Sequence, residues 1–139
     1  MSNNAQRNPT FLIVDDNKRI LDFLSDQLNH HGYKTLTAIN AQKALDLLKN
    51  NKPDFALIDI RLPDINGIEL SKKISSSLSQ IIIILMTGYP NVRDALKNVE
   101  AQIFDYLIKP FKIQQLLMSI KRAQKYSELI LKNSQKDTR

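Results

Sequence analysis

Residues 55–59 read Phe-Ala-Leu-Ile-Asp, an apolar run that ends on a carboxylate. Three other mostly apolar runs also end at polar or charged groups, namely Phe11–Val14 before Asp15-Asp16, Ile81–Met86 before Thr87-Gly88, and Phe104–Ile108 before Lys109-Pro110. Short continuous apolar runs are typical of parallel strands that are covered on both faces. If these runs are neighbouring strands, three carboxylates, a hydroxyl and an ammonium meet at one edge of a sheet.

Stretches with helical periodicity lie between these runs. We expect strands near 10–14, 33–38, 54–58, 81–86 and 103–107. We expect helices near 18–30, 41–50, 67–77 and 91–100, and a longest helix that begins after Phe111. Strands that alternate with helices predict a doubly wound α/β fold with a parallel sheet and helices on both faces. The alternating pattern of 33–38 predicts an edge strand, and ligands in such sheets bind where the strand order reverses.

The composition is that of one ordinary globular domain. The chain has 139 residues, of which 42% are hydrophobic, and that length allows a single core. Its longest apolar run, Ile81–Met86, is far too short to span a membrane, and the polar start Met1–Pro9 lacks a signal-peptide core. The absence of cysteine excludes disulfides, thiolate catalysis and Cys-based zinc sites. We therefore expect a cytoplasmic protein that is not bound to a membrane.

The net charge of +6 is concentrated at one end of the chain. Residues 1–108 hold 12 Lys and Arg against 12 Asp and Glu, whereas residues 109–139 hold 8 against 2, and 8 − 2 = 6. Such a segment is typical of a solvated helix face followed by a charged tail. We prefer this interpretation to direct binding of nucleic acid.

Asp15, Asp16 and Asp59 would repel one another as bare anions at close range, because nearby like charges raise one another's pKa. A bound divalent cation removes this conflict, and a set of oxygen ligands selects Mg²⁺ or Mn²⁺ over zinc. A carboxylate can also act as a nucleophile and form an acyl phosphate. Lys109 and Thr87 would then stabilise the charge on the phosphoryl oxygens. The donor would be a phosphohistidine of another protein or a small acyl phosphate, since no Walker-type loop is present.

Each of these residues also has an ordinary structural explanation. Asp16 can cap a helix, Asp59 can be a solvated loop residue, Thr87 can end a strand and Lys109 can lie on the surface. Their occurrence at the ends of successive strands favours the functional interpretation.

Over residues 9–124 the chain resembles a response regulator receiver domain of two-component signalling, of the chemotaxis-regulator type. The matching segments are LIVDD (12–16), LIDIRLPDING (57–67), MTGY (86–89) and DYLIKPF (105–111). The resemblance implies a flavodoxin-like strand order 2-1-3-4-5. It also implies a signalling module and not an enzyme, which takes up a phosphoryl group from a sensor histidine kinase or phosphotransfer protein and loses it slowly by itself.

The resemblance also implies a role for each site residue. Asp59 is expected to be the phosphoacceptor, and Asp16, Asp59 and the backbone carbonyl of Arg61 are expected to bind Mg²⁺. Asp15 is expected to assist through water. Thr87 and Lys109 are expected to contact the phosphoryl group, and the Lys109-Pro110 peptide bond is expected to be cis.

Thr87 and Tyr106 match the family's switch positions. Their movement is expected to reshape the face made by the helix at 91–100, the strand at 103–107 and the helix after Phe111. Arg61 and Tyr89 match two variable positions that flank the site, where they are expected to modulate loss of the phosphoryl group. Many receivers have Gly-Ala where this chain has Gln102-Ile103, so the helix at 91–100 is expected to end differently.

The apolar pattern of the last helix continues past the expected domain end, through Tyr126, Leu129, Ile130 and Leu131. We expect residues 125–139 to be a helical extension with a polar tail that is disordered from Asn133. The extension would be a linker to an output domain or would pack between two protomers of a homodimer formed through the switch face.

Two other functions remain open at this point. A flavodoxin-like or phosphatase-like enzyme would use the same edge of the sheet, but a flavin protein needs a phosphate-binding loop where this chain has Asp15-Asp16. A degenerate receiver would serve only as an interaction scaffold, which the intact set of Asp59, Thr87 and Lys109 disfavours.

Overall fold

The structure is a computed structural model that describes residues 8–88 and 103–137, with side chains described up to residue 129. The chain divides into two compact units, Met1–Lys109 and Pro110–Arg139. The first unit contains a five-stranded sheet, and the second contains one long helix.

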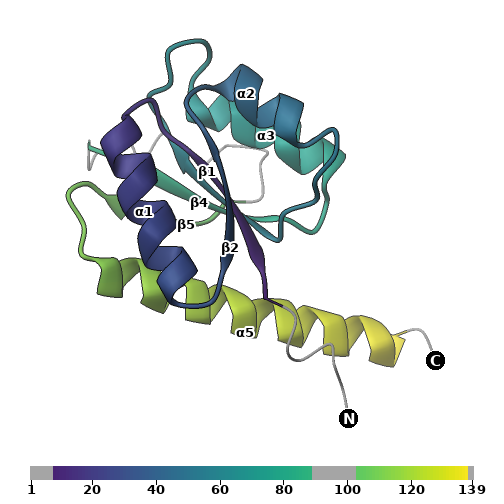
Figure 1. Cartoon of the computed structure of the whole chain (residues 1–139). Helices are drawn as coiled ribbons and strands as arrows, with labels where there is room; N and C mark the ends of the chain where they lie inside the picture. Colours follow the sequence, from purple (N-terminus) through teal and green to yellow (C-terminus); the bar gives the residue numbers. More distant parts are fainter. Residues whose placement is uncertain (1–7, 89–102, 138–139) are drawn as a thin grey trace. The chain divides into compact units, whose positions relative to one another are not determined.

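All five strands of the first unit are parallel and form one sheet in the order β2-β1-β3-β4-β5 (Figure 1). This order confirms the predicted fold class, and every predicted strand agrees with the structure to within one residue at each end. The edge position of β2 confirms what its alternating pattern predicted, and the order reverses between β1 and β3. The strands are β1 Thr10–Val14, β2 Lys34–Ala38, β3 Phe55–Asp59, β4 Ile82–Thr87 and β5 Ile103–Ile108.

Helices cover the two faces of this sheet. The helices α2 (Ala41–Leu47) and α3 (Gly67–Ser77) lie side by side on one face, and α1 (Lys18–His30) lies on the other (Figure 1). Because successive strand residues point to opposite faces, Leu12 and Val14 of β1 join a buried cluster with α2 and α3. The central strands are covered on both sides, which explains their continuous apolar sequences.

The helix ends follow local sequence signals. Asparagine caps α1, α2 and α3, and Gly32 after α1 has a φ of +92°, a left-handed conformation that glycine adopts readily. The bounds of α1 and α3 agree with the prediction. The prediction that α2 extends to residue 50 is wrong, because hydrogen bonds of the tighter three-residue type from Lys49 and Asn50 end the helix after Leu47.

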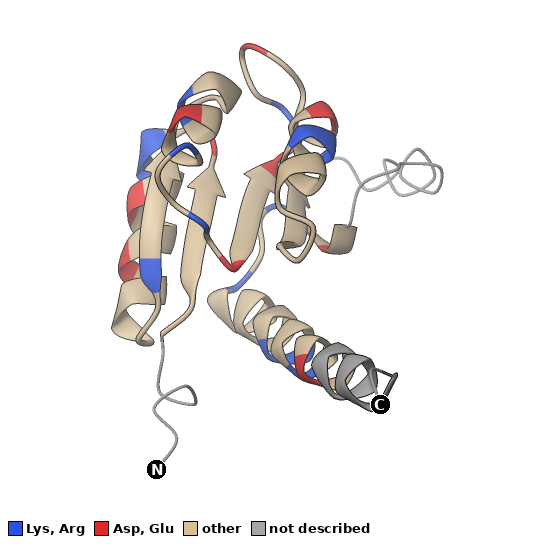
Figure 2. Cartoon of the chain, turned by 90° about the vertical axis from the view of Figure 1, so that its right-hand side faces the viewer, with Lys and Arg blue, Asp and Glu red and all other residues tan. Residues whose placement is uncertain are grey.

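The helix α5 (Ile113–Asp137) is the longest element, as predicted. The expectation of a disordered tail from Asn133 is wrong as far as residue 137, because no glycine or proline interrupts the helix there. Lys and Arg recur along its described surface (Figure 2), while Met118, Tyr126 and Leu129 are exposed apolar residues. The predicted helix at 91–100 lies outside the described residues. Within the described part of the chain, every helix is too short or too polar to cross a membrane.

Candidate functional site

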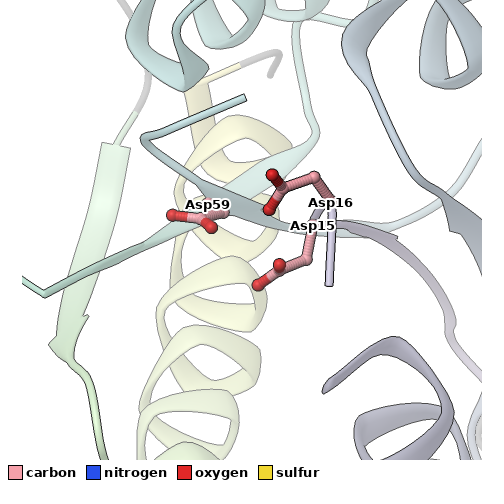
Figure 3. A group of neighbouring side chains, drawn as sticks. All are labelled: Asp15, Asp16 and Asp59. Carbon is pink, nitrogen blue, oxygen red and sulfur yellow. The ribbon is translucent and has the colours of Figure 1, made fainter. Parts of the chain in front are cut away.

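The carboxyl ends of the strands bring the predicted acidic residues together. Asp15 and Asp16 follow β1, and Asp59 is the last residue of β3, the neighbouring strand. One carboxylate oxygen from each of the three lies within 4.8 Å of the others, and the side chains face the same space (Figure 3). The structure therefore forms the cluster that the strand-end pattern predicted.

Asp15 is the most buried member of this cluster. Its side chain is fully buried, and its backbone N–H donates to the carbonyl of Ala38 at 3.1 Å. Its Oδ1 accepts a hydrogen bond from the backbone of Asn17 at 2.9 Å. Asn17 in turn caps α1, so the alternative explanation of Asp16 as the helix cap is wrong. Asp16 is exposed beside the cluster.

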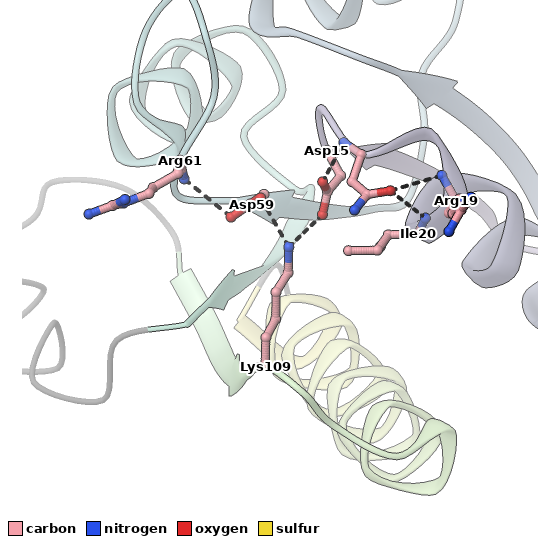
Figure 4. Close-up of polar contacts among 7 residues, drawn as sticks. Asp15, Arg19, Ile20, Asp59, Arg61 and Lys109 are labelled. Carbon is pink, nitrogen blue, oxygen red and sulfur yellow. Dashed lines mark hydrogen bonds and ion pairs between the residues drawn. The ribbon is translucent and has the colours of Figure 1, made fainter.

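Lys109 joins two of the three carboxylates. Its Nζ donates to Asp15 Oδ2 at 2.7 Å and to Asp59 Oδ2 at 3.0 Å (Figure 4). The ion pairs are largely shielded, since the side chain of Lys109 is 22% exposed and that of Asp59 is 10% exposed. The backbone N–H of Lys109 donates to the carbonyl of Thr87 at 2.7 Å, so the end of β4 positions the backbone of Lys109. Thr87 itself is buried.

The pKa values of this pair reflect competition between burial and charge. Burial raises the pKa of Asp59 above its ordinary value, although the hydrogen bond and the positive charge of Lys109 act in the opposite direction. Burial lowers the pKa of Lys109, but hydrogen bonds and attraction from Asp15 and Asp59 together raise it above its ordinary value. Lys109 is therefore a firmly charged ammonium at neutral pH, and Asp59 is an anion that its surroundings only partly stabilise.

The loop after β3 and the start of α3 lie close to Asp59. The backbone N–H of Arg61 donates to Asp59 Oδ1 at 3.2 Å, while the exposed side chain of Arg61 points away from Asp59 and Lys109 (Figure 4). The N–H of Gly67 donates to the carbonyl of Ile60 at 2.6 Å and closes the loop. A Cβ on Gly67 would collide with the backbone carbonyl oxygen of Asp59, so only glycine permits this approach.

Gly67 and Asn17 were not among the predicted site residues. Gly67 ends the matching segment 57–67, and its place after the Asp59 loop was a usable signal. The cap by Asn17 was also available, because asparagine before an apolar-periodic stretch is a common start of a helix.

The remaining predicted residues are distributed between the described and undescribed parts of the chain. Tyr106 lies in β5, is partly buried and packs against the cluster shared with α2 and α3. Tyr89 and Gln102 lie outside the described residues. The predicted switch face is therefore described only for β5 and for α5.

The donor set fits a small, hard cation. The carboxylates of Asp15, Asp16 and Asp59 offer oxygen atoms only, and together with Lys109 they sum to −2 when all are ionised, from −3 + 1. Oxygen ligands that include one or two carboxylates suit Mg²⁺, which keeps several of its waters. The exposed position of Asp16 leaves room for those waters on one side.

A family model for the response regulator receiver domain matches residues 11–121. The chain belongs to this family. The receiver domain is similar to Regulatory protein AtoC of Escherichia coli strain K12, with 38% identity over 112 residues that make up 81% of this chain. It is also similar to Sporulation initiation phosphotransferase F of Bacillus subtilis strain 168, with 32% identity over 83% of this chain and 93% of that protein.

Among solved structures, the receiver domain resembles the response regulator TrrA of Thermotoga maritima in complex with Mg²⁺ and BeF. The TM-score is 0.75 at 29% identity, over 83% of this chain and 98% of that one. The chain spans 24% of the length of AtoC and 46% of several other related response regulators.

Family membership and the aspartate cluster together favour one of the open alternatives. This chain is a phosphoacceptor receiver domain of the two-component type, a signalling module with a cluster of aspartates at its phosphorylation site. A flavodoxin-like or phosphatase-like enzyme is not favoured, and neither is a degenerate scaffold.

Proposed function

We propose that Asp59 accepts a phosphoryl group from a sensor histidine kinase or a phosphotransfer protein. The observation that carries this proposal is the double contact of Lys109 Nζ with Asp15 and Asp59 at the carboxyl edge of the sheet. It holds a positive charge against Asp59, where the negative charge of an incoming phosphoryl group must be balanced. The names of the relatives, a regulatory protein and a phosphotransferase, support the same class of reaction.

In this proposal a carboxylate oxygen of Asp59 forms a bond to phosphorus while the phosphorus–nitrogen bond of the donor phosphohistidine breaks. Lys109 Nζ stabilises the transferred oxygens, and Thr87 at the end of β4 donates a hydrogen bond to them. The Lys109-Pro110 peptide bond is proposed to be cis. Arg61 and Tyr89 modulate the slow loss of the phosphoryl group to water.

Asp16, Asp59 and the backbone carbonyl of Arg61 are proposed to hold Mg²⁺ or Mn²⁺, with Asp15 assisting through water. The cation supplies charge neutralisation for the carboxylates and the phosphoryl oxygens. Support comes from the oxygen-only donor set and from the Mg²⁺ and BeF in the TrrA structure.

Thr87 and Tyr106 are proposed to transmit the charge change to the face of β5, α5 and the helix expected at 91–100. This receiver, at 9–124, would then associate with a second copy, and the helix from residue 125 would serve as a linker to an output domain. The greater length of AtoC, of which this chain spans 24%, supports a linker. A cytoplasmic location is proposed because it is where phosphorylating kinases and output domains act.

The test is the intact mass of the chain after incubation with acetyl phosphate, with and without Mg²⁺. We expect one phosphoryl group on the wild type only when Mg²⁺ is present, and none on Asp59→Asn. Asp54→Asn is a matched control, because Asp54 precedes β3 at its opposite end and Asn keeps an acceptor for the N–H of Thr10. Equal labelling of the wild type and Asp59→Asn would show that Asp59 is not the phosphoacceptor.

A further inference from the structure

The loop of residues 60–66, between β3 and α3, is held firmly at both ends. At one end, the N–H of Ile60 donates to the carbonyl of Met86 on β4 at 2.9 Å. At the other end, the N–H of Gly67 donates to the carbonyl of Ile60. Between these points lies Arg61, whose carbonyl is the proposed backbone ligand of the cation. The position of that carbonyl depends on what holds the middle of the loop.

Asp64 holds the middle of the loop to a different element. Its Oδ1 accepts the N–H of Ala41 at 3.0 Å, and its Oδ2 accepts the N–H of Gln42 at 2.9 Å. These donors belong to the first turn of α2, 22 and 23 residues earlier in the chain. Oδ1 also accepts the N–H of Ile65 within the loop at 3.0 Å, which fixes the side chain relative to its own backbone.

The first turn of α2 has its own cap, and Asp64 does not duplicate it. The side chain of Asn40 accepts the N–H of Lys43 at 2.7 Å, and its carbonyl accepts the N–H of Ala44. Asp64 takes the two N–H groups that Asn40 does not reach, at the end of the helix where a negative charge is favourable. Ala41 and Ala44 are buried in the core, so α2 is a fixed support for the loop.

Conditional on the proposed phosphorylation site, we propose that Asp64 is a positioning residue that ties the loop at 60–66 to α2 and thereby fixes the Arg61 carbonyl beside Asp59. The side chain of Asp64 accepts hydrogen bonds from α2 and from its own loop, and it acts on the site through the backbone that it anchors. Groups that orient ligands in this way commonly change metal affinity by about 10–100-fold when they are removed.

The test compares Asp64→Ala with Asn40→Ala in the full chain. Both variants remove hydrogen bonds from the same turn of α2, and both are expected to lower its stability to a similar extent. Asp64→Ala is expected to weaken Mg²⁺ binding, measured by calorimetry, by about tenfold. Asn40→Ala is expected to leave Mg²⁺ affinity within about twofold of the wild type, because it leaves the loop tied.

A second readout is the phosphorylation rate as a function of Mg²⁺ concentration. For Asp64→Ala the Mg²⁺ concentration that gives half the maximal rate should rise about tenfold, in line with its weaker binding, while the rate at saturating Mg²⁺ stays near that of the wild type. Asp64→Asn keeps one oxygen acceptor and should restore most of the affinity.

The outcomes separate the two proposals. If Asp64→Ala and Asn40→Ala bind Mg²⁺ equally well, the positioning role is overturned, whatever their stability. If Asp64→Asn binds as weakly as Asp64→Ala, the hydrogen-bonding role is overturned. A wild type that neither binds Mg²⁺ nor takes up a phosphoryl group overturns the proposed function itself.

Discussion

Replacement of Gly67 by alanine tests how closely α3 must approach the phosphorylation site. The added Cβ would collide with the backbone carbonyl oxygen of Asp59 and would lie 2.9 Å from Cγ2 of Ile58. The first of these neighbours is backbone in the central strand β3, so the strain cannot be relieved by rotation of a side chain. The start of α3 must therefore move away from β3.

The size of the effect follows from two opposing contributions. Overpacking in a fixed environment costs about 1–3 kcal/mol, and backbone contact places Gly67→Ala toward the upper part of that range. The higher helix propensity of alanine offsets up to about 1 kcal/mol of this loss of stability. We expect a net loss of about 2 kcal/mol, which lowers Tm by roughly 6–10 °C for a domain of this size.

The assay is thermal unfolding followed by circular dichroism, with Gly88→Ala as the matched control. Among the described residues, a Cβ on Gly88 meets nothing within 4 Å, so this variant should stay within about 0.5 kcal/mol of the wild type. Gly67→Ala should also slow phosphorylation, because a shifted start of α3 displaces the loop at 60–66, whose Arg61 N–H donates to Asp59. Equal Tm values for the two variants would refute the close-approach argument.

Three further predictions concern the site and α5. Lys109→Ala should impair the response to beryllofluoride more than it impairs Mg²⁺ binding, because Lys109 Nζ contacts Asp15 and Asp59 as a cation and not as a metal ligand. An equal loss of both in calorimetry would contradict this role of Lys109. Asp59→Asn should be more stable than the wild type at pH 7 in EDTA, because the raised pKa of Asp59 in the folded state means that folding disfavours its ionised form. This difference in stability should vanish as the pH falls below the unfolded-state pKa of about 3.9. A variant that is less stable than the wild type in urea unfolding at pH 7 would contradict the predicted direction. Beryllofluoride should strengthen self-association of the chain, measured by sedimentation, and Leu129→Glu, at an exposed apolar position of α5, should weaken it. If every sample is a monomer at high protein concentration, α5 is a linker only.

The sequence by itself determined the strands, the helices α1 and α3, and which residues follow the strand ends. Continuous apolar runs of four to six residues predicted β1, β3 and β4 to within one residue, because a strand covered on both faces requires an apolar side chain at each position. Helical periodicity likewise predicted α1 and α3. The strand ends then placed Asp15, Asp16 and Asp59 at one edge, as parallel strands must.

The ends of two helices were less predictable. The apolar residues of α2 suggested a helix to residue 50, but tight hydrogen bonds in the last turn end it at Leu47. Residues 133–137 looked too polar for order, yet α5 continues through them, because polarity alone does not end a helix that lacks a breaking residue. In both cases local geometry outweighed the hydrophobic pattern.

Only the tertiary structure decided which contacts hold the site in place. The ion pairs of Lys109 join residues 50 and 94 positions apart, and Asp64 reaches α2 across 22 and 23 residues. The need for glycine at position 67 arises from the approach of α3 to the carbonyl of Asp59. These constraints act between segments that become neighbours only when the sheet and its helices pack, so a local sequence pattern can mark a residue such as Gly67 but does not specify what it contacts.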